Sequence, residues 1–393
     1  MTMPYRFHLT AILSPAALLV ASCGHAATGD SAPPEQVARK DAPFSVSEES
    51  HFDEPWALAV EPGSGRIFVT EKRGTIRHYQ PASAVEGSVG GVPEVDYGGQ
   101  GGLGDIAFAP DYEASRMVYL SWAEAGPGDT RGAAVGRGQL ECSGENDEHC
   151  RLAGFEVIWR QVPKVTGRGH YSHRLAFSPD GQYLFVASGE RQKMAPAQDL
   201  GTNLGKIVRL TLDGTAAAGN PLAGKPAPTD QLWSWGHRNI LGLAFDPQGR
   251  LWELEHGPRG GDELNLVQPG RNYGWPLVSD GVHYNGDPIP DHATRPDLAA
   301  PAVNWTPVIA PGDMIFYSAG EFPEWDGQVL IAGLGSQALV RVAIEGESAR
   351  EVARYDMGMR LRDIVQGIDG SLWVVEDKGK GRLLRLAPKI AEN

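Results

Sequence analysis

The chain has 393 residues, of which 41% are apolar, and a formal net charge of −14 at pH 7. Such an acidic chain lacks the basic surface that nucleic-acid binding requires, so we exclude that class of function. The apolar content is sufficient for a large core. The 50 glycines and 29 prolines indicate many turns.

The N-terminus has the pattern of an export signal. Arg6 precedes the mostly apolar segment 9–20, which is too short to span a membrane as a mature helix. The segment ends in Val-Ala-Ser-Cys, which resembles the lipobox of bacterial lipoproteins, so Cys23 is the expected lipidated residue. An ordinary secretory signal, cut within the small residues 21–27, is the alternative. In both cases the chain leaves the cytoplasm, and we expect a periplasmic or cell-envelope protein, anchored in the outer membrane through Cys23.

A segment rich in proline, alanine and charged residues follows, without hydrophobic periodicity. This composition is typical of a flexible linker. We therefore predict three parts: a signal peptide at 1–22, a flexible tether at 23–48 and one folded domain at 49–393.

The folded domain repeats one sequence pattern six times. An alternating apolar run is followed by a turn containing Pro, Asp or Gly and by a second β-rich run, which is typical of a β-hairpin. Copies spaced roughly 45 to 75 residues apart predict one four-stranded blade each. The expected fold is an all-β, six-bladed β-propeller, and a β-sandwich or two smaller all-β domains is the alternative. The six copies are 57–71, 105–124, 175–190, 243–257, 314–333 and 364–377.

Cys142 and Cys150 enclose a polar loop. In an oxidising compartment this spacing predicts a disulfide that closes the tip of a hairpin. A metal-binding pair is the alternative, which is weaker because the chain has no second cysteine pair.

Two interruptions of the blades are candidates for a site. In the loop 98–104 (GGQGGLG), glycines permit a close backbone approach and leave Gln100 as the side chain able to hydrogen-bond a ligand; an ordinary turn is the alternative. In 169–175 (GHYSHRL), residues three apart on an extended segment face opposite sides, which disfavours a metal shared by His170 and His173. His170 is better suited as a general base, oriented by Glu190. A surface histidine and a surface glutamate are the alternative.

Three further motifs, GHRN at 236–239, G-P-x-x-x-D-E-x-N at 257–265 and NYGWP at 272–276, occur in this order. Together they resemble the soluble aldose sugar and glucose dehydrogenases that use pyrroloquinoline quinone (PQQ), and the resemblance extends over 55–388. It implies oxidation of an aldose or oligosaccharide to a lactone, with PQQ and Ca²⁺ bound and electrons passed to an external acceptor.

The resemblance also implies roles for particular residues. His170 matches the catalytic base and Glu190 the acid that supports it. The matching cofactor contacts are Gln100, Arg238, Asn239, Arg360 and Arg362. The matching metal ligands are the carbonyls of Gly257 and Pro258 for the catalytic Ca²⁺, and Glu263 and Tyr273 for a second calcium site.

The chemistry of PQQ agrees with these matches. PQQ is a planar quinone with three carboxylates, and arginine pairs with carboxylates through two parallel hydrogen bonds. On a strand, Arg360 and Arg362 are expected to point to the same face. Calcium takes oxygen ligands and acts as a Lewis acid. Ordinary ion pairing between blades is the alternative for each single arginine.

One position departs from the family pattern. Gly335 stands where the family has a lysine close to the cofactor. The missing cation is expected to weaken PQQ binding unless Arg259 or Lys378 replaces it. Two other functions therefore stay open: a Ca²⁺-dependent propeller hydrolase of the lactonase kind, and a non-catalytic, anchored binding propeller.

Overall fold

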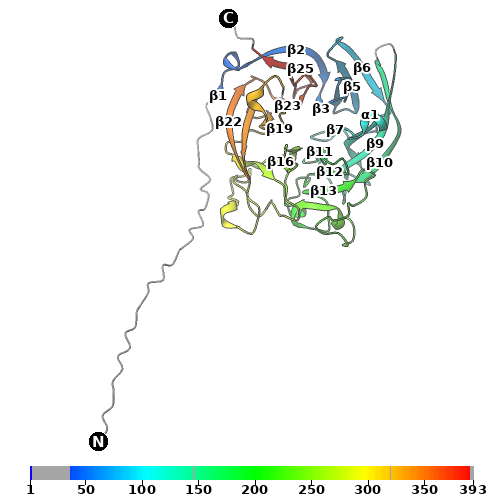
Figure 1. The fold of residues 1–393 in the computed structure, drawn as a ribbon. Coiled ribbons are helices and arrows are strands. Elements are labelled where there is room, and N and C mark those ends of the chain that lie inside the picture. The colour runs from blue at the N-terminus through cyan, green and yellow to red at the C-terminus, as the bar shows by residue number, and fades with distance from the viewer. Residues whose placement is uncertain (2–35, 145–146, 319, 390–393) are drawn as a thin grey trace. The chain divides into compact units, whose positions relative to one another are not determined.

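The computed structural model describes Met1 and residues 36–144, 147–318 and 320–389. The predicted signal peptide, Cys23 and the tether up to residue 35 lie outside the described residues. From residue 36 onward, four-stranded blades stand in a ring (Figure 1). The first strands of successive blades contact one another around the whole ring. The prediction of an all-β, six-bladed propeller is confirmed.

The strands follow the chain blade by blade, and each of the six predicted hairpins forms the first two strands of one blade. The bounds are, for blade I, β3 (Pro55–Val60), β4 (Ile67–Glu71), β5 (Thr75–Gln80) and β6 (Val85–Gly90); for blade II, β7 (Leu103–Phe108), β8 (Met117–Ala125), β9 (Arg131–Ser143) and β10 (His149–Arg160); for blade III, β11 (Ser172–Phe177), β12 (Tyr183–Ser188), β13 (Lys206–Thr211) and β14 (Leu232–Trp235). For the remaining blades they are, in blade IV, β15 (Ile240–Phe245), β16 (Leu251–Glu255), β17 (Asp262–Leu266) and β18 (Val303–Trp305); in blade V, β19 (Pro311–Phe316), β20 (Val329–Gly333), β21 (Ala338–Glu345) and β22 (Ser348–Asp356), with β1 (Gln36–Val37) at its edge; and in blade VI, β23 (Leu361–Gln366), β24 (Leu372–Glu376), β25 (Lys380–Pro388) and β2 (Phe44–Asp53).

Helices are few and short in the described part of the chain, and none is long or apolar enough to cross a bilayer. They are η1 (Arg39–Asp41), α1 (Tyr112–Ser115), η2 (Ala195–Gln198), η3 (Thr229–Gln231), η4 (His292–Thr294) and η5 (Pro323–Trp325).

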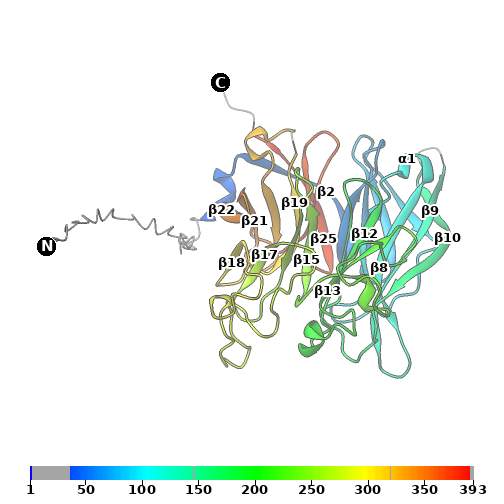
Figure 2. The ribbon, with the colours of Figure 1, turned by 60° about the horizontal axis from the view of Figure 1, so that its bottom comes forward.

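Blade VI closes the ring with strands from both ends of the chain. β2 pairs antiparallel with β25, from Phe44 opposite Pro388 to Asp53 opposite Lys380 (Figure 2). The predicted border between tether and domain at residue 49 is therefore wrong, because β2 begins at Phe44. The short β1 also adds to the edge of blade V through β22.

Blades I and II share one eight-stranded sheet, because β10 pairs parallel with the outer strand β6. Cys142 on β9 lies opposite Cys150 on β10, and the two form a disulfide at the end of this hairpin. The predicted disulfide is confirmed, and the alternative of a metal-binding cysteine pair is wrong.

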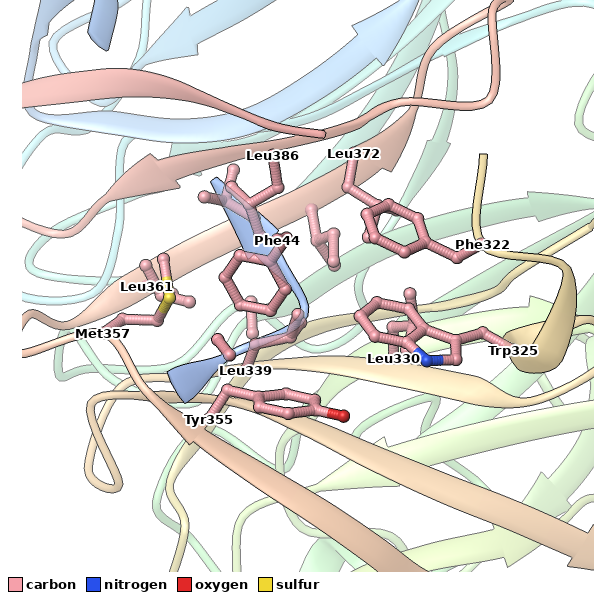
Figure 3. Close-up of a cluster of buried hydrophobic side chains, with 14 of the residues drawn as sticks. Phe44, Phe322, Trp325, Leu330, Leu339, Tyr355, Met357, Leu361, Leu372 and Leu386 are labelled. Carbon is pink, nitrogen blue, oxygen red and sulfur yellow. The ribbon is translucent and has the colours of Figure 1, made fainter. Parts of the chain in front are cut away.

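Apolar side chains fill the space between every two neighbouring blades. In β24, Leu372 and Val374 belong to the cluster between blades V and VI, whereas Trp373 and Val375 belong to the cluster between blades VI and I. A strand covered on both faces reads as a continuous apolar run. Figure 3 shows the first of these clusters, where Phe44 of β2 packs edge-on against Trp325 with ring centroids 6.2 Å apart. The closing strand is thus held by packing as well as by hydrogen bonds.

One guanidinium in the middle of the ring contacts every blade other than its own. Arg174 lies on β11 of blade III, and its side chain is 5% exposed. It donates from Nη1 to Asp363 Oδ2 over 2.7 Å, and from Nε and Nη2 to two backbone carbonyls over 2.6 and 2.7 Å. Its partners from blades I, II, IV, V and VI are, in turn, the Trp56 ring, Asp105, the Leu241 carbonyl, the Gly312 carbonyl with Asp313, and Asp363.

Three buried carboxyl groups share this one cation. Burial raises the pKa values of Asp105, Asp313 and Asp363, that of Asp363 to about 7, although Arg174 acts in the opposite direction. The folded chain therefore holds protons that the unfolded chain releases near pH 3.8. The contribution of Asp363 to stability is complete below that pH and is lost as the pH rises through about 7.

We expect Arg174→Met to lower the free energy of unfolding by about 3–5 kcal/mol, because it leaves buried carboxyl groups without their cation. Urea unfolding followed by tryptophan fluorescence measures the change. Arg295→Met is the control, since Arg295 pairs with Asp297 at the surface and should leave the midpoint nearly unchanged. Equal midpoints for the two variants would contradict the role of Arg174.

Candidate functional site

A cavity of about 280 Å³ lies where the innermost strands begin and the second strands end. Four of the predicted cofactor contacts line it, from the glycine-rich loop, blade IV and blade VI: Gln100, Asn239, Arg360 and Arg362. Arg238, the fifth, lines a smaller adjoining cavity in blade IV, and His256 belongs to the walls of both. The structure thus brings the predicted contacts into one region.

His170 and Glu190 form a buried pair beside the larger cavity. His170 Nδ1 lies 2.5 Å from Glu190 Oε1, and the side chains are 8% and 1% exposed. The other oxygen of Glu190 accepts a hydrogen bond from the backbone of Met194 over 2.5 Å. With Nδ1 engaged, Nε2 is the nitrogen of His170 that can take a proton from a substrate.

The pKa values of both His170 and Glu190 are lowered, for different reasons. Burial lowers the pKa of His170 below its ordinary 6.5, against the effect of the hydrogen bond that its Nδ1 donates to Glu190. For Glu190 burial acts to raise the pKa, but the hydrogen bond and charge of His170 prevail and lower it below 4.5. At neutral pH the pair is therefore a neutral imidazole held by a carboxylate, the state a general base needs.

The backbone around His170 is not extended as the sequence suggested. His170, Ser172 and His173 have φ values of 49°, 65° and 74°, in the left-handed region, and the β11–β12 register shifts after Ser172. Such conformations are costly and persist where surrounding contacts fix them. Gln100 Oε1 accepts from the His170 N–H over 2.6 Å, and Asn239 Oδ1 accepts from the Ser172 N–H over 3.3 Å. Two predicted cofactor contacts thus also hold the segment of the predicted base.

Arg360 and Arg362 lie on the same side of their strand, as expected. Both donate to Asp377, Arg360 Nε to Oδ2 over 2.9 Å and Arg362 Nε to Oδ1 over 2.9 Å. One carboxylate therefore fixes two guanidinium groups at the cavity wall and leaves a net positive charge there. This arrangement suits an anionic, planar ligand.

Arg238 is buried between two aromatic rings, with its guanidinium 5.2 Å from the Trp275 ring centroid and 5.8 Å from that of Tyr284. Nη1 donates to the His256 carbonyl over 3.0 Å, and the backbone N–H donates to Glu255 over 2.5 Å. Its Nε has no hydrogen-bond partner within the described chain. Arg238 is therefore rigidly placed, and a donor remains for a ligand.

The smaller cavity, of about 10 Å³, has room for one small ion. Its walls include the four predicted metal-binding residues, Gly257, Pro258, Glu263 and Tyr273, together with Glu255. A side-chain carbon at Gly257 would lie 2.2 Å from the Gly261 carbonyl oxygen, so only glycine permits this turn. Carboxylates and backbone carbonyls are the ligands that Ca²⁺ prefers, and the donor set fits this ion.

The side chain of Tyr273 is a poorer candidate for a metal ligand than the sequence suggested. Its hydroxyl donates to the Leu266 carbonyl over 2.6 Å and accepts from the Gln268 N–H over 2.8 Å. Its ring stacks on His237, with centroids 4.7 Å apart. The phenol group is thus engaged in the protein, and the backbone N–H also donates to the Trp235 carbonyl over 2.9 Å. The carbonyl lies 3.3 Å from His292 Nε2 and retains a second lone pair for a ligand.

A buried acidic cluster lies behind this cavity. Burial raises the pKa of Glu263 to about 8 and that of Glu253 to about 7. Burial acts to lower the pKa of His237, but the carboxylates of Glu253 and Glu255, 3.4 and 3.8 Å from its Nδ1, prevail and raise it to about 9. His237, Glu253 and Glu255 are, within the described residues, the one group of three able to hold a metal ion. Because Ca²⁺ takes oxygen ligands, we do not count the imidazole of His237 among the calcium ligands.

Gly335 is a glycine for a local reason. A side-chain carbon there would lie 2.9 Å from the Ala310 Cβ and 3.0 Å from the Ile309 carbonyl oxygen. The neighbouring Leu334 lines the cavity instead. The lysine of the family pattern does not fit this backbone.

Sequence reasoning assigned no role to several polar residues of the cavity wall, among them Lys72, His173 and His256. His173 stacks on Tyr171 with rings 5.2 Å apart, and burial lowers its pKa to about 3, so it is neutral. Its place in the GHYSHRL motif, three residues after His170, was the one feature of the sequence that could have predicted a position at the site. Lys72 reads as an ordinary charged turn residue after a strand, and nothing local marks it.

Comparisons with known proteins agree with the fold and identify the family. A model of the glucose/sorbosone dehydrogenase family matches residues 52–385. The chain therefore belongs to the glucose/sorbosone dehydrogenase family. It is 37% identical over 358 residues to aldose sugar dehydrogenase YliI of Escherichia coli, covering 88% of this chain and 94% of that protein.

Solved structures show the same likeness. The apo-form of the soluble aldose sugar dehydrogenase from Escherichia coli superposes with a TM-score of 0.80 at 36% identity, covering 88% of this chain and all of that one. The PQQ-bound form of an aldose sugar dehydrogenase from Streptomyces coelicolor gives a TM-score of 0.70 at 28% identity, with 91% of this chain and all of that one covered.

We expect the pKa of His170 to lie below 6.5, and Glu190→Gln to lower it further because the hydrogen bond to the carboxylate favours the charged imidazole. Titration of the histidine ring resonances by NMR measures both values. Glu156→Gln, at an exposed pair with Arg137, is the control and should change nothing. A His170 pKa that rises in Glu190→Gln would contradict the assigned hydrogen bond.

Proposed function

We propose that this protein is a PQQ- and Ca²⁺-dependent dehydrogenase that oxidises an aldose or oligosaccharide to its lactone and passes the electrons to an external acceptor. The observation that carries the proposal is the pair His170–Glu190 beside a cavity lined by cations. A base with a free Nε2 and a site for an anionic planar ligand are both required for this chemistry, and both occur at the same end of the ring.

Different residues would bind PQQ, bind calcium and transfer the proton. Gln100, Asn239, Arg238, Arg360 and Arg362 would hold the PQQ, and the carbonyls of Gly257 and Pro258, with Glu255 and Glu263 nearby, would hold the calcium. When bound, PQQ would supply the acceptor for a hydride from the anomeric carbon, and calcium would supply a Lewis acid beside it. His170 takes the proton of the anomeric hydroxyl at Nε2, and Glu190 stabilises the resulting imidazolium.

The test combines apo-protein with PQQ and Ca²⁺, then adds glucose or maltose and an artificial dye acceptor. We expect a change in PQQ absorbance on binding and dye reduction that requires sugar, quinone and calcium together. Absence of both signals would overturn the proposal. Lactone hydrolysis without PQQ would instead indicate the calcium-dependent hydrolase, and calcium binding without either activity would indicate the binding propeller.

The variant His170→Ala separates the base from the binding site. Loss of general-base catalysis should reduce dye reduction by about 10²–10⁴-fold while the absorbance change of bound PQQ persists. The matched control is His51→Ala, on the outer strand β2, which should keep full activity. Activity retained in His170→Ala would show that another group removes the proton.

We further propose that the protein is exported and anchored by a lipid on Cys23. The support is the sequence Val-Ala-Ser-Cys after the apolar segment. In fractionated cells that express the natural chain, we expect the protein with the membranes, and Cys23→Ser should release it. Wild-type protein found only in the soluble periplasmic fraction would favour the ordinary secretory signal.

A further inference from the structure

Lys72 is held at the wall of the larger cavity by its backbone and by its amine. It follows β4 directly, and its N–H donates to the Glu54 carbonyl over 3.0 Å while its carbonyl accepts from Leu103 over 2.9 Å. Nζ donates to the Gly99 carbonyl over 2.9 Å and lies 5.9 Å from the Tyr97 ring centroid. The side chain is thus fixed beside the glycine-rich loop, next to Gln100.

Lys72 differs from the other two cations of the cavity wall in its pairing. Three cations line the cavity, and two of them, Arg360 and Arg362, form ion pairs with Asp377. Lys72 forms no ion pair with any residue in the described ranges. Burial lowers its pKa, and the nearby charge of Arg362 acts in the same direction, whereas the carboxylates of Glu54 and Asp377 act in the opposite direction. A partly desolvated cation without a directly paired carboxylate is unfavourable, so an anion in the cavity would be bound preferentially at this point.

The other two candidates for the missing lysine do not reach the cavity. Lys378 forms an ion pair with Glu376 over 2.6 Å and is half exposed. Arg259 is exposed, and its backbone pairs with Val282 outside the cavity wall. Since Gly335 has no room for a side chain, Lys72 is left as the additional cation.

We infer that Lys72 is a positioning residue that binds a carboxylate of PQQ and supplies the cation that is missing at Gly335. This inference rests on the proposed function. A hydrogen bond to a charged group contributes about 1.5–3 kcal/mol, which corresponds to about a 10- to 150-fold change in the dissociation constant.

The experiment titrates PQQ into the wild type and each variant, prepared without PQQ and saturated with Ca²⁺, and determines the dissociation constant of PQQ. Binding is followed by quenching of the tryptophan fluorescence, to which Trp56 in the cavity wall contributes. We expect Lys72→Met to raise the constant at least about tenfold, with a weaker dependence on salt, and Lys72→Arg to recover most of the affinity. Lys378→Met is the matched control and should bind as the wild type does. Lys72→Gln retains a donor for the Gly99 carbonyl without the charge, so it separates lost charge from local distortion.

The outcomes distinguish the two proposals. If the wild type binds PQQ and Lys72→Met and Lys72→Gln bind it equally well, the role of Lys72 is wrong and the proposed function stands. If Lys72→Gln binds as the wild type does and only Lys72→Met is weak, the effect is local packing and the inference is overturned. If the wild type binds no PQQ, the proposed function fails and the inference fails with it.

Discussion

A single buried guanidinium is the constraint on which this propeller depends. Arg174 contacts a ring, a carboxylate or a carbonyl in each of the other five blades. One side chain therefore links the innermost strands of all six blades. The site is built directly on that strand, because His170 and His173 precede Arg174 in the chain. Hydrogen bonds from the His170 and Ser172 N–H groups to Gln100 and Asn239 hold the left-handed backbone of this segment.

The candidate site divides into two halves with different chemistry. On one side, Lys72, Arg360 and Arg362 face a single carboxylate, Asp377, which produces a positive wall suited to an anionic organic ligand. On the other side, blade IV supplies carboxylates and a glycine turn suited to a hard cation. His256 lies in both walls and donates from Nε2 to the Pro311 carbonyl over 2.6 Å. A ligand in the larger cavity and an ion in the smaller one would therefore both lie next to this fixed imidazole.

The sequence allowed the fold to be predicted where the signal is local. The first two strands of each blade carry alternating apolar residues and a turn, whereas β2 (Phe44–Asp53) is mostly polar and pairs with the far end of the chain, so no local pattern marks it. For the site, alternation along a strand placed Arg360 and Arg362 together. The importance of Arg174 and of Lys72 could not be predicted, because both follow from the closure of the ring, which brings distant segments to one point.

That closure also fixes the order in which the molecule can be completed. Ser45 on β2 hydrogen-bonds to the Ala387 carbonyl, 342 positions later in the chain. Blade VI therefore cannot form during synthesis until nearly the last residue is available, although blades I to V consist almost entirely of consecutive strands. For the same reason, a truncation at either terminus removes a strand from the same blade.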